Sequence, residues 1–412
     1  MNGDKPARFP VRVWLISFLG WTFDFYDLML ISFLLIPIGK DLGLTAPEEA
    51  LILGVALGAS GIGGILFGYL SDRYGRKQVM TWTIALYSLG TALCAFSSGP
   101  WSLLVFRLIT GLGVGGEWAV GHALVQEASP GHMRGRAAAF LQAGEPLGVG
   151  LAAVMGLLVT PLIGWRWVFV VSSASAVLAV VARRHLPEST LWTRQKEDHL
   201  SPAAALRWIV RNGFFGPLWK GFLLGVFKLG TYWTCYVWLP RFLQQYFHQP
   251  VGRSAIWILT AQSGQLAGML LFGFAADRYG RRQAYTAYSL LTAGAIYALA
   301  FHWAWMLQTP GLFWTVMFAM GVGSGCTAGF GALLAELFPT QVRNFSMGTA
   351  YNCARGVQFF APIVVSALVS QYGVRGGLGV PLVLALATAS WVWVLPETRR
   401  RDLARIASSN RT

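Results

Sequence analysis

The sequence predicts an all-α polytopic membrane protein whose twelve transmembrane helices form two six-helix bundles. Of its 412 residues, 55% are hydrophobic and 12% are charged, and the mean hydropathy is +0.52. A soluble domain carries roughly 25% charged residues. The charged segment 68–77 (GYLSDRYGRK) returns 205 positions later at 273–282 (GFAADRYGRR). A repeat so far apart, flanked by long apolar runs in both places, indicates two homologous halves built from spanning helices.

Apolar runs of spanning length define the predicted helices, because about 20 apolar residues are needed to cross the hydrocarbon core of a bilayer. Twelve such runs agree with both chain ends lying on the same side of the membrane. The runs fall at 13–38, 51–70, 78–97, 101–126, 137–160, 165–183, 218–240, 255–276, 283–303, 311–335, 346–371 and 376–395.

A polar segment is expected to join the two halves. We expect an N-terminal bundle at 1–186, a cytoplasmic central loop at 187–217 and a C-terminal bundle with a cytoplasmic tail at 218–412. A second register of the repeat supports this division, because Pro-Glu-Ser at 187–189 matches Pro-Glu-Thr at 396–398. Secondary transporters are commonly built from repeats of this kind, with the substrate site between them.

The formal net charge of +15 has a topological explanation. Most Lys and Arg residues fall in the termini and in alternate loops, including both repeated loops and the central loop. This positive-inside pattern places both termini in the cytoplasm and leaves no basic excess that requires a nucleic-acid partner. We expect a monomer in the lipid bilayer of the plasma (inner) membrane, with no cleavable signal before the first span.

The sequence shows no pattern for a cofactor, a metal or a nucleotide. Four cysteines, Cys94, Cys235, Cys326 and Cys353, lie in apolar runs without metal or disulfide spacing, which favours a packing role. No loop with a Gly-Lys-Ser/Thr ending occurs, which excludes an ATP-driven pump of that type. We therefore expect no cofactor, no metal and no enzymatic activity.

Several motifs resemble the signatures of the major facilitator superfamily. They are Asp72-Arg-Tyr-Gly-Arg76 and its copy at 277–281, Arg107-x₃-Gly-x-Gly-x-Gly115 in the fourth span, and the two Pro-Glu-Ser/Thr segments. The resemblance covers essentially the whole chain and implies the major facilitator fold.

The same resemblance implies a gate role for the repeated loops. In the superfamily, acidic and arginine side chains of these loops form a charge network that holds one gate conformation. Opposite charges at a helix–loop junction can pair in one state and separate in the other. The alternative is that these charges only set the topology. The residues in the gate positions are Asp72, Arg73, Arg76, Asp277, Arg278 and Arg281.

Three further segments resemble the proton symporters of organic acids, which include the sialate, lactate, aromatic-acid and metabolite groups. They are Gly-Trp-x-x-Asp-x-x-Asp at 20–27, Gly-Gly-Glu-Trp at 115–118, and Pro-Glu-Ser followed by Trp192. The fifth span departs from this pattern. Its segment Gly-Glu-Pro-Leu-Gly at 144–148 is similar to the Gly-Pro motif of drug antiporters, which keeps proton-driven multidrug or metabolite efflux open as an alternative.

The ionisable residues inside the predicted spans indicate the mechanism, because each costs several kcal/mol in hydrocarbon unless it faces a cavity or a partner. The bases Lys228 and Arg355 lie in the C-terminal half, whereas every acid lies in the N-terminal half. Such an asymmetry fits one half that carries protons and another that holds an anion. The proposed proton-coupling residues are Asp24, Asp27, Glu117, Glu145 and Arg107.

Asp24 and Asp27 are the first candidates for the coupled proton. They are three positions apart and share a helical face, and two close carboxylates repel when both are charged, which favours keeping a proton on one. The alternative is that each acid is satisfied by a structural base. Glu117 lies about 15 Å along the helix from Arg107, so these two are not partners.

Arg355 and Lys228 are the candidates for binding a substrate carboxylate. The planar guanidinium of Arg355 suits bidentate binding of a carboxylate, and aromatic and amide residues share the helical faces of both bases. The alternative is that both bases neutralise the acids across the bundle, and the two interpretations are compatible. The predicted substrate-binding residues are Arg355, Lys228, Asn352, Tyr232, Tyr236, Gln262 and Gln265.

These observations predict a secondary active transporter that takes up a small organic anion with protons by alternating access. The candidate anions are a monocarboxylate, a sialate-like acid or an aromatic acid. Efflux of cationic drugs fits the buried acids but not the buried Lys228 and Arg355. A membrane-embedded enzyme would need a convergent catalytic set, and a sensor would need a larger appended domain than the central loop.

Overall fold

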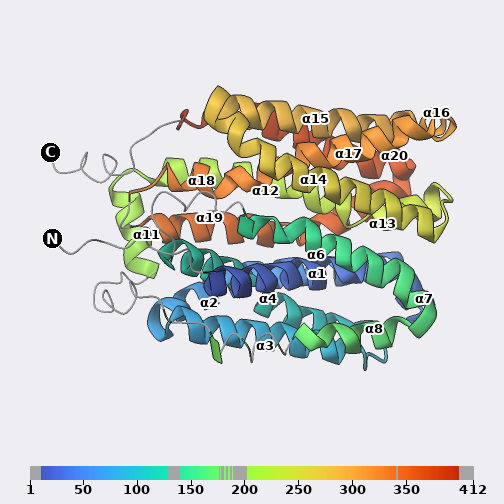
Figure 1. Cartoon of the computed structure of the whole chain (residues 1–412), viewed down its shortest axis with the longest axis horizontal. Helices are drawn as coiled ribbons and strands as arrows, with labels where there is room; N and C mark the ends of the chain where they lie inside the picture. Colours follow the sequence, from blue (N-terminus) through green and yellow to red (C-terminus); the bar gives the residue numbers. More distant parts are fainter. Residues whose placement is uncertain are drawn as a thin grey trace.

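The computed structural model describes residues 11–128, 140–175, 177, 181, 184–185, 188, 202–339 and 342–398. These residues form helices and short connections, and no strand occurs among them. The helices run nearly parallel to the long axis of the molecule (Figure 1). The predicted all-α membrane fold is confirmed.

The first half contributes the helices drawn in the lower part of Figure 1. Trp21 to Leu35 of the first helix are almost all buried, because this helix is surrounded by others on every side. The elements are α1 (Val11–Leu42), α2 (Ala46–Tyr74), α3 (Arg76–Cys94), α4 (Pro100–Ala128), α6 (Gly144–Ala153), the π-helix η2 (Val154–Val159), α7 (Thr160–Ile163), α8 (Trp165–Ser172) and η3 (Ser173–Ser175).

The second half begins with a short helix at one end of the molecule, followed by the helices drawn in the upper part of Figure 1. The short helix lies within the predicted central loop. The elements are α11 (Pro202–Arg211), α12 (Phe215–Tyr236), α13 (Leu239–Arg241), η4 (Phe242–Tyr246), α14 (Val251–Tyr279), α15 (Arg281–Phe301), α16 (Trp303–Gln308), α17 (Pro310–Ser324), η5 (Gly325–Gly329), α18 (Phe330–Ala335), α19 (Arg343–Val357), α20 (Phe360–Trp391) and η6 (Val392–Val394).

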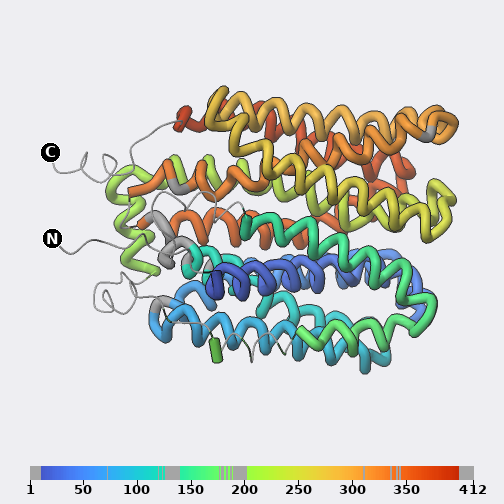
Figure 2. Tube along the Cα trace, viewed as in Figure 1, coloured from blue at the N-terminus to red at the C-terminus, as the bar shows by residue number. Residues whose placement is uncertain are grey.

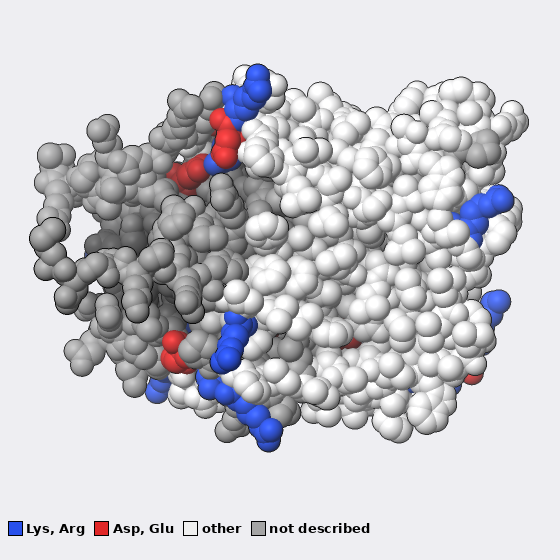
Figure 3. All heavy atoms as spheres, viewed as in Figure 1, with Lys and Arg blue, Asp and Glu red and all other residues white. Residues whose placement is uncertain are grey.

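Membrane character is evident from both composition and surface. Eight of the described helical stretches are long and apolar enough to span a bilayer, and one of them, of 50 residues, contains the last two predicted spans. Figure 3 shows Lys, Arg, Asp and Glu at the two ends of the visible face, with a band nearly free of them between. This band is what an apolar bilayer core requires.

The eleventh predicted span, at 346–371, is interrupted in the structure. Helix α19 ends at Val357 and α20 begins at Phe360, so the helix breaks one turn after Arg355. The Gln358 side chain donates to the carbonyls of Ala354 (2.9 Å) and Val226 (3.2 Å), which provides partners where the helix breaks. Interruptions of this kind are found where a helix borders a functional cavity.

Gly373 separates the last two spans, as the sequence predicts. Its φ of 65° is strained for any residue with a side chain. After it the chain folds back on itself, and a Cβ on Gly376 would lie 2.7 Å from the Leu368 carbonyl oxygen. The trace in Figure 2 shows this chain region doubling back at the end opposite α11.

Small residues bring the two halves into contact. A Cβ on Gly54 would lie 2.4 Å from the Phe359 carbonyl oxygen, and one on Gly61 would lie 2.7 Å from the Gly356 Cα. Helix α2 therefore packs closely on the α19–α20 junction. A second contact between the halves joins α6 and α14. Glycine at such crossings allows backbones in a membrane to approach each other.

The sequence repeat is also a structural repeat at the charged loops. Gly75 and Gly280 have φ values of 100° and 107°. The next backbone N–H, that of Arg76, donates to Glu188 (2.9 Å), and the N–H of Arg281 donates to Glu397 (3.0 Å). Each Pro-Glu-Ser/Thr motif thus supplies a carboxylate that caps the first turn of the helix after the repeated loop, where N–H groups lack intrahelical partners.

We expect Glu397→Ala to lower the free energy of unfolding by about 1–2 kcal/mol, because it removes the cap of α15. The matched control is Asp277→Ala. Asp277 pairs with the same Arg281 at 3.0 Å, but its side chain is 75% exposed, and such a pair contributes about 1 kcal/mol or less. Thermal unfolding in detergent provides the comparison. A Glu397 variant as stable as the Asp277 control would contradict the capping role.

Candidate functional site

The centre of the molecule contains a fully buried ion pair between the halves. Nη2 of Arg355 on α19 donates to Oδ2 of Asp24 on α1 at 3.2 Å, and both side chains are 0% exposed. Two predicted site residues that are 331 positions apart in the sequence are thus brought together. Breaking a buried pair by removing one partner typically costs 3–5 kcal/mol, so this contact strongly constrains the relative position of α1 and α19.

Aromatic rings surround the Arg355 guanidinium. Its central carbon lies 5.9 Å from the ring centre of Trp21 and 5.7 Å from that of Phe25. Its Nε and Nη1 atoms have no hydrogen-bond partner among the described residues, and neither does Oδ1 of Asp24. Arg355 therefore retains donor capacity for a second carboxylate, in a setting where aromatic faces stabilise its charge.

Asp27 and Arg107 form a second acid–base couple deeper in the first half. Both side chains are fully buried. Arg107 is the positive charge that acts on Asp27, and Asp24 is the neighbouring negative one. No hydrogen bond joins Asp27 to Arg107 among the described contacts. The couple therefore differs from the Asp24–Arg355 pair, because it lies within one half and is not in direct contact.

Glu117 on α4 lies against the backbone of α1. Its Oε2 accepts a hydrogen bond from Thr83 at 3.2 Å, and a Cβ built on Gly20 would lie 2.2 Å from its Oε1. The glycine of the Gly20-Trp21 motif thus leaves the space that the Glu117 carboxyl occupies. The charge of Asp24 acts on Glu117, and no base contacts Glu117 among the described residues. This arrangement agrees with the prediction that Arg107 is not the partner of Glu117.

Glu145 connects the halves through hydrogen bonds. It accepts from Nε2 of Gln142 at 2.8 Å and from Nε2 of Gln265 on α14 at 2.8 Å. Gln265 therefore contacts an internal acid, while both amide atoms of its neighbour Gln262 lack a partner among the described residues. Two amide donors stabilise the charged form of a buried carboxylate.

Lys228 on α12 is a buried base, and no acid of the described part of the chain is in contact with it. Its Nζ donates to the backbone oxygen of Ser324 at 3.1 Å, and no ion pair to Lys228 occurs among the described residues. Ser324 is the last residue of α17 and directly precedes the 3₁₀ segment η5, where the tenth span departs from α-helical geometry. The Tyr236 hydroxyl lies 3.4 Å from the Ser324 hydroxyl.

Two aromatic contacts between the halves lie on either side of the ion pair. Trp118 on α4 stacks on Tyr351 on α19, with ring centres 3.9 Å apart and an interplanar angle of 11°. Phe25 stacks on Trp233 on α12 at 5.9 Å and 19°. These contacts are between ring faces and are not hydrogen bonds, so they can separate without breaking a hydrogen bond.

The positions of the two stacks follow from the helix directions. Helices α12 and α19 both begin at the end of the molecule that carries α11 (Figure 1). Tyr351 is one turn nearer that end than Arg355, whereas Trp233 lies 18 residues into α12, about 27 Å along its axis. The Trp118–Tyr351 stack therefore covers the α11 side of the site, and the Phe25–Trp233 stack covers the opposite side.

The end opposite α11 is closed by further contacts between the halves. Arg241 of α13 forms an ion pair with Glu49 of α2.

Asn352, a predicted substrate residue, lies next to Tyr351 on the α11 side of Arg355. It faces α2, because a Cβ on Gly64 would lie 2.3 Å from its amide carbon. Its Oδ1 has no partner among the described residues.

The predicted gate residues lie at the α11 end. Arg76 is 5% exposed and donates to the Ser71 carbonyl at 2.9 Å, and Arg281 pairs with Asp277 and, at 3.2 Å, with Glu336. Arg73 and Arg278 each lie over the following tyrosine ring. The described contacts all join elements of one half. The Asp72 side chain lies outside the described residues.

Sequence reasoning missed several residues that shape the site. Trp118 and Tyr351 form the stack on the α11 side, and Glu49 with Arg241 closes the other end. Trp118 was visible as the last residue of the Gly-Gly-Glu-Trp motif. The other three carry no local pattern, because their roles depend on contacts between distant segments.

Comparison with known proteins identifies the family and supports the fold. The family model described as Major Facilitator Superfamily matches residues 15–261 and 249–410. The chain is 33% identical to a Haemophilus influenzae protein whose name assigns it to metabolite transport, covering 94% of this chain and 96% of that protein. It is 30% identical to the sialic acid transporter of Escherichia coli, covering 95% of this chain and 94% of that protein.

Solved structures support the same fold. The partially occluded inward-open xylose transporter of Escherichia coli superimposes with a TM-score of 0.77 at 19% identity, covering 96% of this chain and 99% of that chain. The chain belongs to the major facilitator superfamily. It is therefore a membrane transporter and not an enzyme.

We expect Gly20→Ala to lower the unfolding temperature, because its methyl group would occupy the position of the Glu117 carboxyl; overpacking of this kind costs about 1–3 kcal/mol. The control is Gly121→Ala, since a Cβ there would meet only the Ser17 Cβ at 3.9 Å. In a Glu117→Ala background the cost of Gly20→Ala should largely disappear. An equal cost in both backgrounds would show that the carboxyl is not the obstacle.

Proposed function

We propose that the protein takes up an organic anion together with protons by alternating access. Relatives of this chain are named as transporters of sialic acid, niacin and cis,cis-muconate, and a structural neighbour is titled a D-xylose–proton symporter. These names support an organic acid as substrate and a proton as the coupled ion. The direct support in this chain is the buried Asp24–Arg355 pair between the halves.

The pair suggests how substrate and proton are coupled. In the closed site Arg355 needs one negative charge, because an uncompensated buried charge costs several kcal/mol. Ionised Asp24 supplies this charge when the carrier is empty. When Asp24 takes up a proton, a substrate carboxylate supplies it instead. Only in these two states do the charges of Arg355, Asp24 and the substrate carboxylate sum to zero. Only in these states can the site close without an uncompensated buried charge.

The remaining combinations are disfavoured by the same argument. A protonated Asp24 without substrate leaves Arg355 uncompensated, and an ionised Asp24 with a bound carboxylate places two negative charges beside one base. Protons therefore cross with the anion, and neither crosses alone. The unused donors Nε and Nη1 of Arg355 are the groups that the substrate carboxylate would engage.

The moving parts in this proposal are two six-helix bundles, 1–186 and 218–412, joined by the segment 187–217. Both termini face the cytoplasm of a cell whose inner membrane holds the protein as a monomer. The Trp118–Tyr351 stack opens toward the cytoplasm, and the Phe25–Trp233 stack with Glu49–Arg241 opens outward. The repeated charged loops act as latches on the cytoplasmic side.

Asp24→Asn should abolish substrate accumulation driven by a pH gradient while retaining substrate counterflow, because a neutral side chain mimics the protonated state. Uptake into proteoliposomes with and without a pH gradient measures this. Asp41→Asn, at the far end of the same helix and 45% exposed, is the control. Asp27→Asn tests the other candidate acid. If both Asp24→Asn and Asp27→Asn proteins still accumulate substrate, neither carries the proton.

Arg355→Ala should weaken substrate binding by about tenfold to more than a hundredfold, the loss expected for a charge-assisted hydrogen bond of roughly 1.5–3 kcal/mol. Arg355→Lys should also impair binding, because lysine cannot reproduce the bidentate geometry. Arg375→Ala, an exposed arginine of α20, is the control. Affinity equal to wild type in both Arg355 variants would remove this residue from the binding site. Tight binding of cationic drugs would favour the efflux alternative.

A further inference from the structure

We propose that Lys228 forms a second anion-binding position beside Arg355, so that the substrate is a planar organic acid with a second anionic oxygen group. The inference rests on the proposed function and names the substrate class for the same site. It starts from the difference between the two buried bases of the second half.

The charge of Lys228 is not matched by a contact with an acid. Its side chain is 4% exposed, and one of its three donors binds the Ser324 carbonyl at 3.1 Å. Buried charges in proteins are generally paired. Arg355 meets this requirement through Asp24, whereas Lys228 has no carboxylate in ion-pair contact among the described residues. An anionic group of the substrate would supply the missing charge.

The helix crossing places both bases at one location. A Cβ on Gly225 of α12 would lie 2.9 Å from the Ala354 Cβ of α19. Arg355 directly follows Ala354, and Lys228 is one turn beyond Gly225. Both bases therefore extend from the same crossing of α12 and α19, and one small molecule can reach both.

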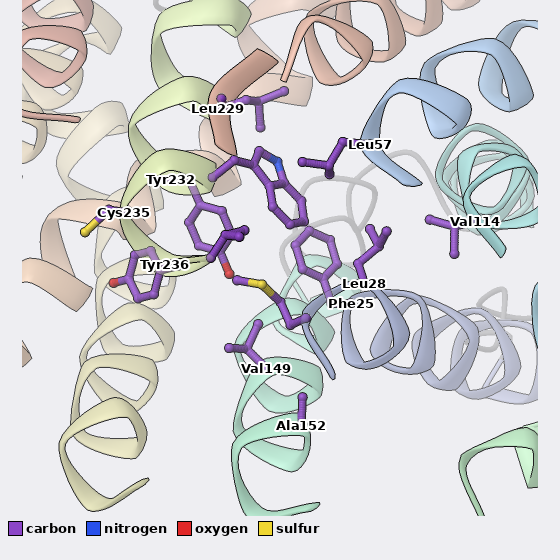
Figure 4. Close-up of a cluster of buried hydrophobic side chains, with 14 of the residues drawn as sticks. Phe25, Leu28, Leu57, Val114, Val149, Ala152, Leu229, Tyr232, Cys235 and Tyr236 are labelled. Atoms are coloured by element: carbon purple, nitrogen blue, oxygen red, sulfur yellow. The ribbon is translucent and has the colours of Figure 1, made fainter. Parts of the chain in front are cut away.

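An aromatic wall connects the two positions. Phe25, whose ring lies against Arg355, contacts Tyr232 at 6.3 Å, and Tyr232 stacks on Tyr236 at 4.6 Å and 26°. The Tyr236 hydroxyl in turn lies beside Ser324, whose carbonyl binds Lys228. Figure 4 shows the ring of Tyr232 between those of Phe25 and Tyr236. Flat faces of this kind suit the planar body of an unsaturated or aromatic acid.

Two unpartnered polar groups belong to the same region. The Tyr232 hydroxyl and the Gln262 amide are buried and lack partners among the described residues. From across the interface, the charge of Glu145 acts on Lys228. The other ionisable neighbours of Glu145 are Arg355, Tyr232, Tyr236 and Tyr351. The Glu145 oxygens accept from Gln142 and Gln265, and no ion pair joins Glu145 to Lys228 among the described residues, so Lys228 remains available to a ligand.

Binding of matched acids to the detergent-purified protein tests this inference. The probes are benzoate and the benzene 1,3- and 1,4-dicarboxylates, which differ only in the second carboxylate. For the wild-type protein we expect at least one dicarboxylate to bind about tenfold or more tightly than benzoate. Lys228→Met should remove this preference, weakening the preferred dicarboxylate about tenfold more than it weakens benzoate. Lys228→Arg, which keeps the charge, should retain the preference.

The control is Lys220→Met, the same substitution two turns earlier on α12, which should change neither affinity. A wild-type protein without dicarboxylate preference would overturn the inference, as would a preference that survives Lys228→Met. Equal weakening of benzoate and dicarboxylate by Lys228→Met would overturn it too, because the lysine would then not act on the second group. These results leave the proposed function intact. Failure of all three acids to bind would also overturn the inference, because all three are planar acids. The proposed function is judged separately, from proton-coupled uptake by the wild-type and Asp24→Asn proteins.

Discussion

The structure depends on one requirement, that the charge of Arg355 be compensated inside a region from which water is excluded. Asp24 meets this requirement from the opposite half, so the pair joins α1 to α19. Removing one partner of such a pair costs several kcal/mol, whereas replacing one anion by another leaves the charge of Arg355 compensated. In the proposed mechanism, the same interaction therefore holds the empty protein closed and selects the anion that is allowed to cross.

The surroundings of the pair follow from this requirement. Aromatic stacks cover the pair on both sides, and these ring contacts can separate without breaking hydrogen bonds. The end opposite α11 is also closed by the Glu49–Arg241 ion pair, which would have to break for that side to open. Glycines on α2 let the second half approach the backbone of the first, and Gly20 makes room for the Glu117 carboxyl beside Asp24. The helices break next to the two buried bases of the second half, at Ser324 near Lys228 and at Gln358 near Arg355. The Ser324 carbonyl binds Lys228, and the Gln358 amide binds the Ala354 carbonyl.

Much of the fold could be predicted from the sequence, because hydrophobic runs report spans and the repeated loops report the two halves. The buried acids and bases were equally visible, since a charge in an apolar run is rare. Their partners were not visible. Asp24 and Arg355 are paired by tertiary packing. The Glu117 carboxyl occupies space left by Gly20 on another helix. The glutamates of the Pro-Glu-Ser/Thr motifs cap helices that are distant in the sequence. The break after Arg355 was missed because Gln358 and Phe359 interrupt the helix without a proline or glycine at the break itself.

The most direct test of this account is the pH dependence of binding of a monocarboxylate that stays ionised throughout. If the substrate replaces Asp24 at Arg355, each bound anion is accompanied by about one proton, and by linkage the dissociation constant rises about tenfold per pH unit on the alkaline side of the transition. The same measurement on the Asp24→Asn protein should give a dissociation constant independent of pH. A wild-type dissociation constant that does not change between about pH 6 and about pH 9 would contradict the exchange of carboxylates at Arg355.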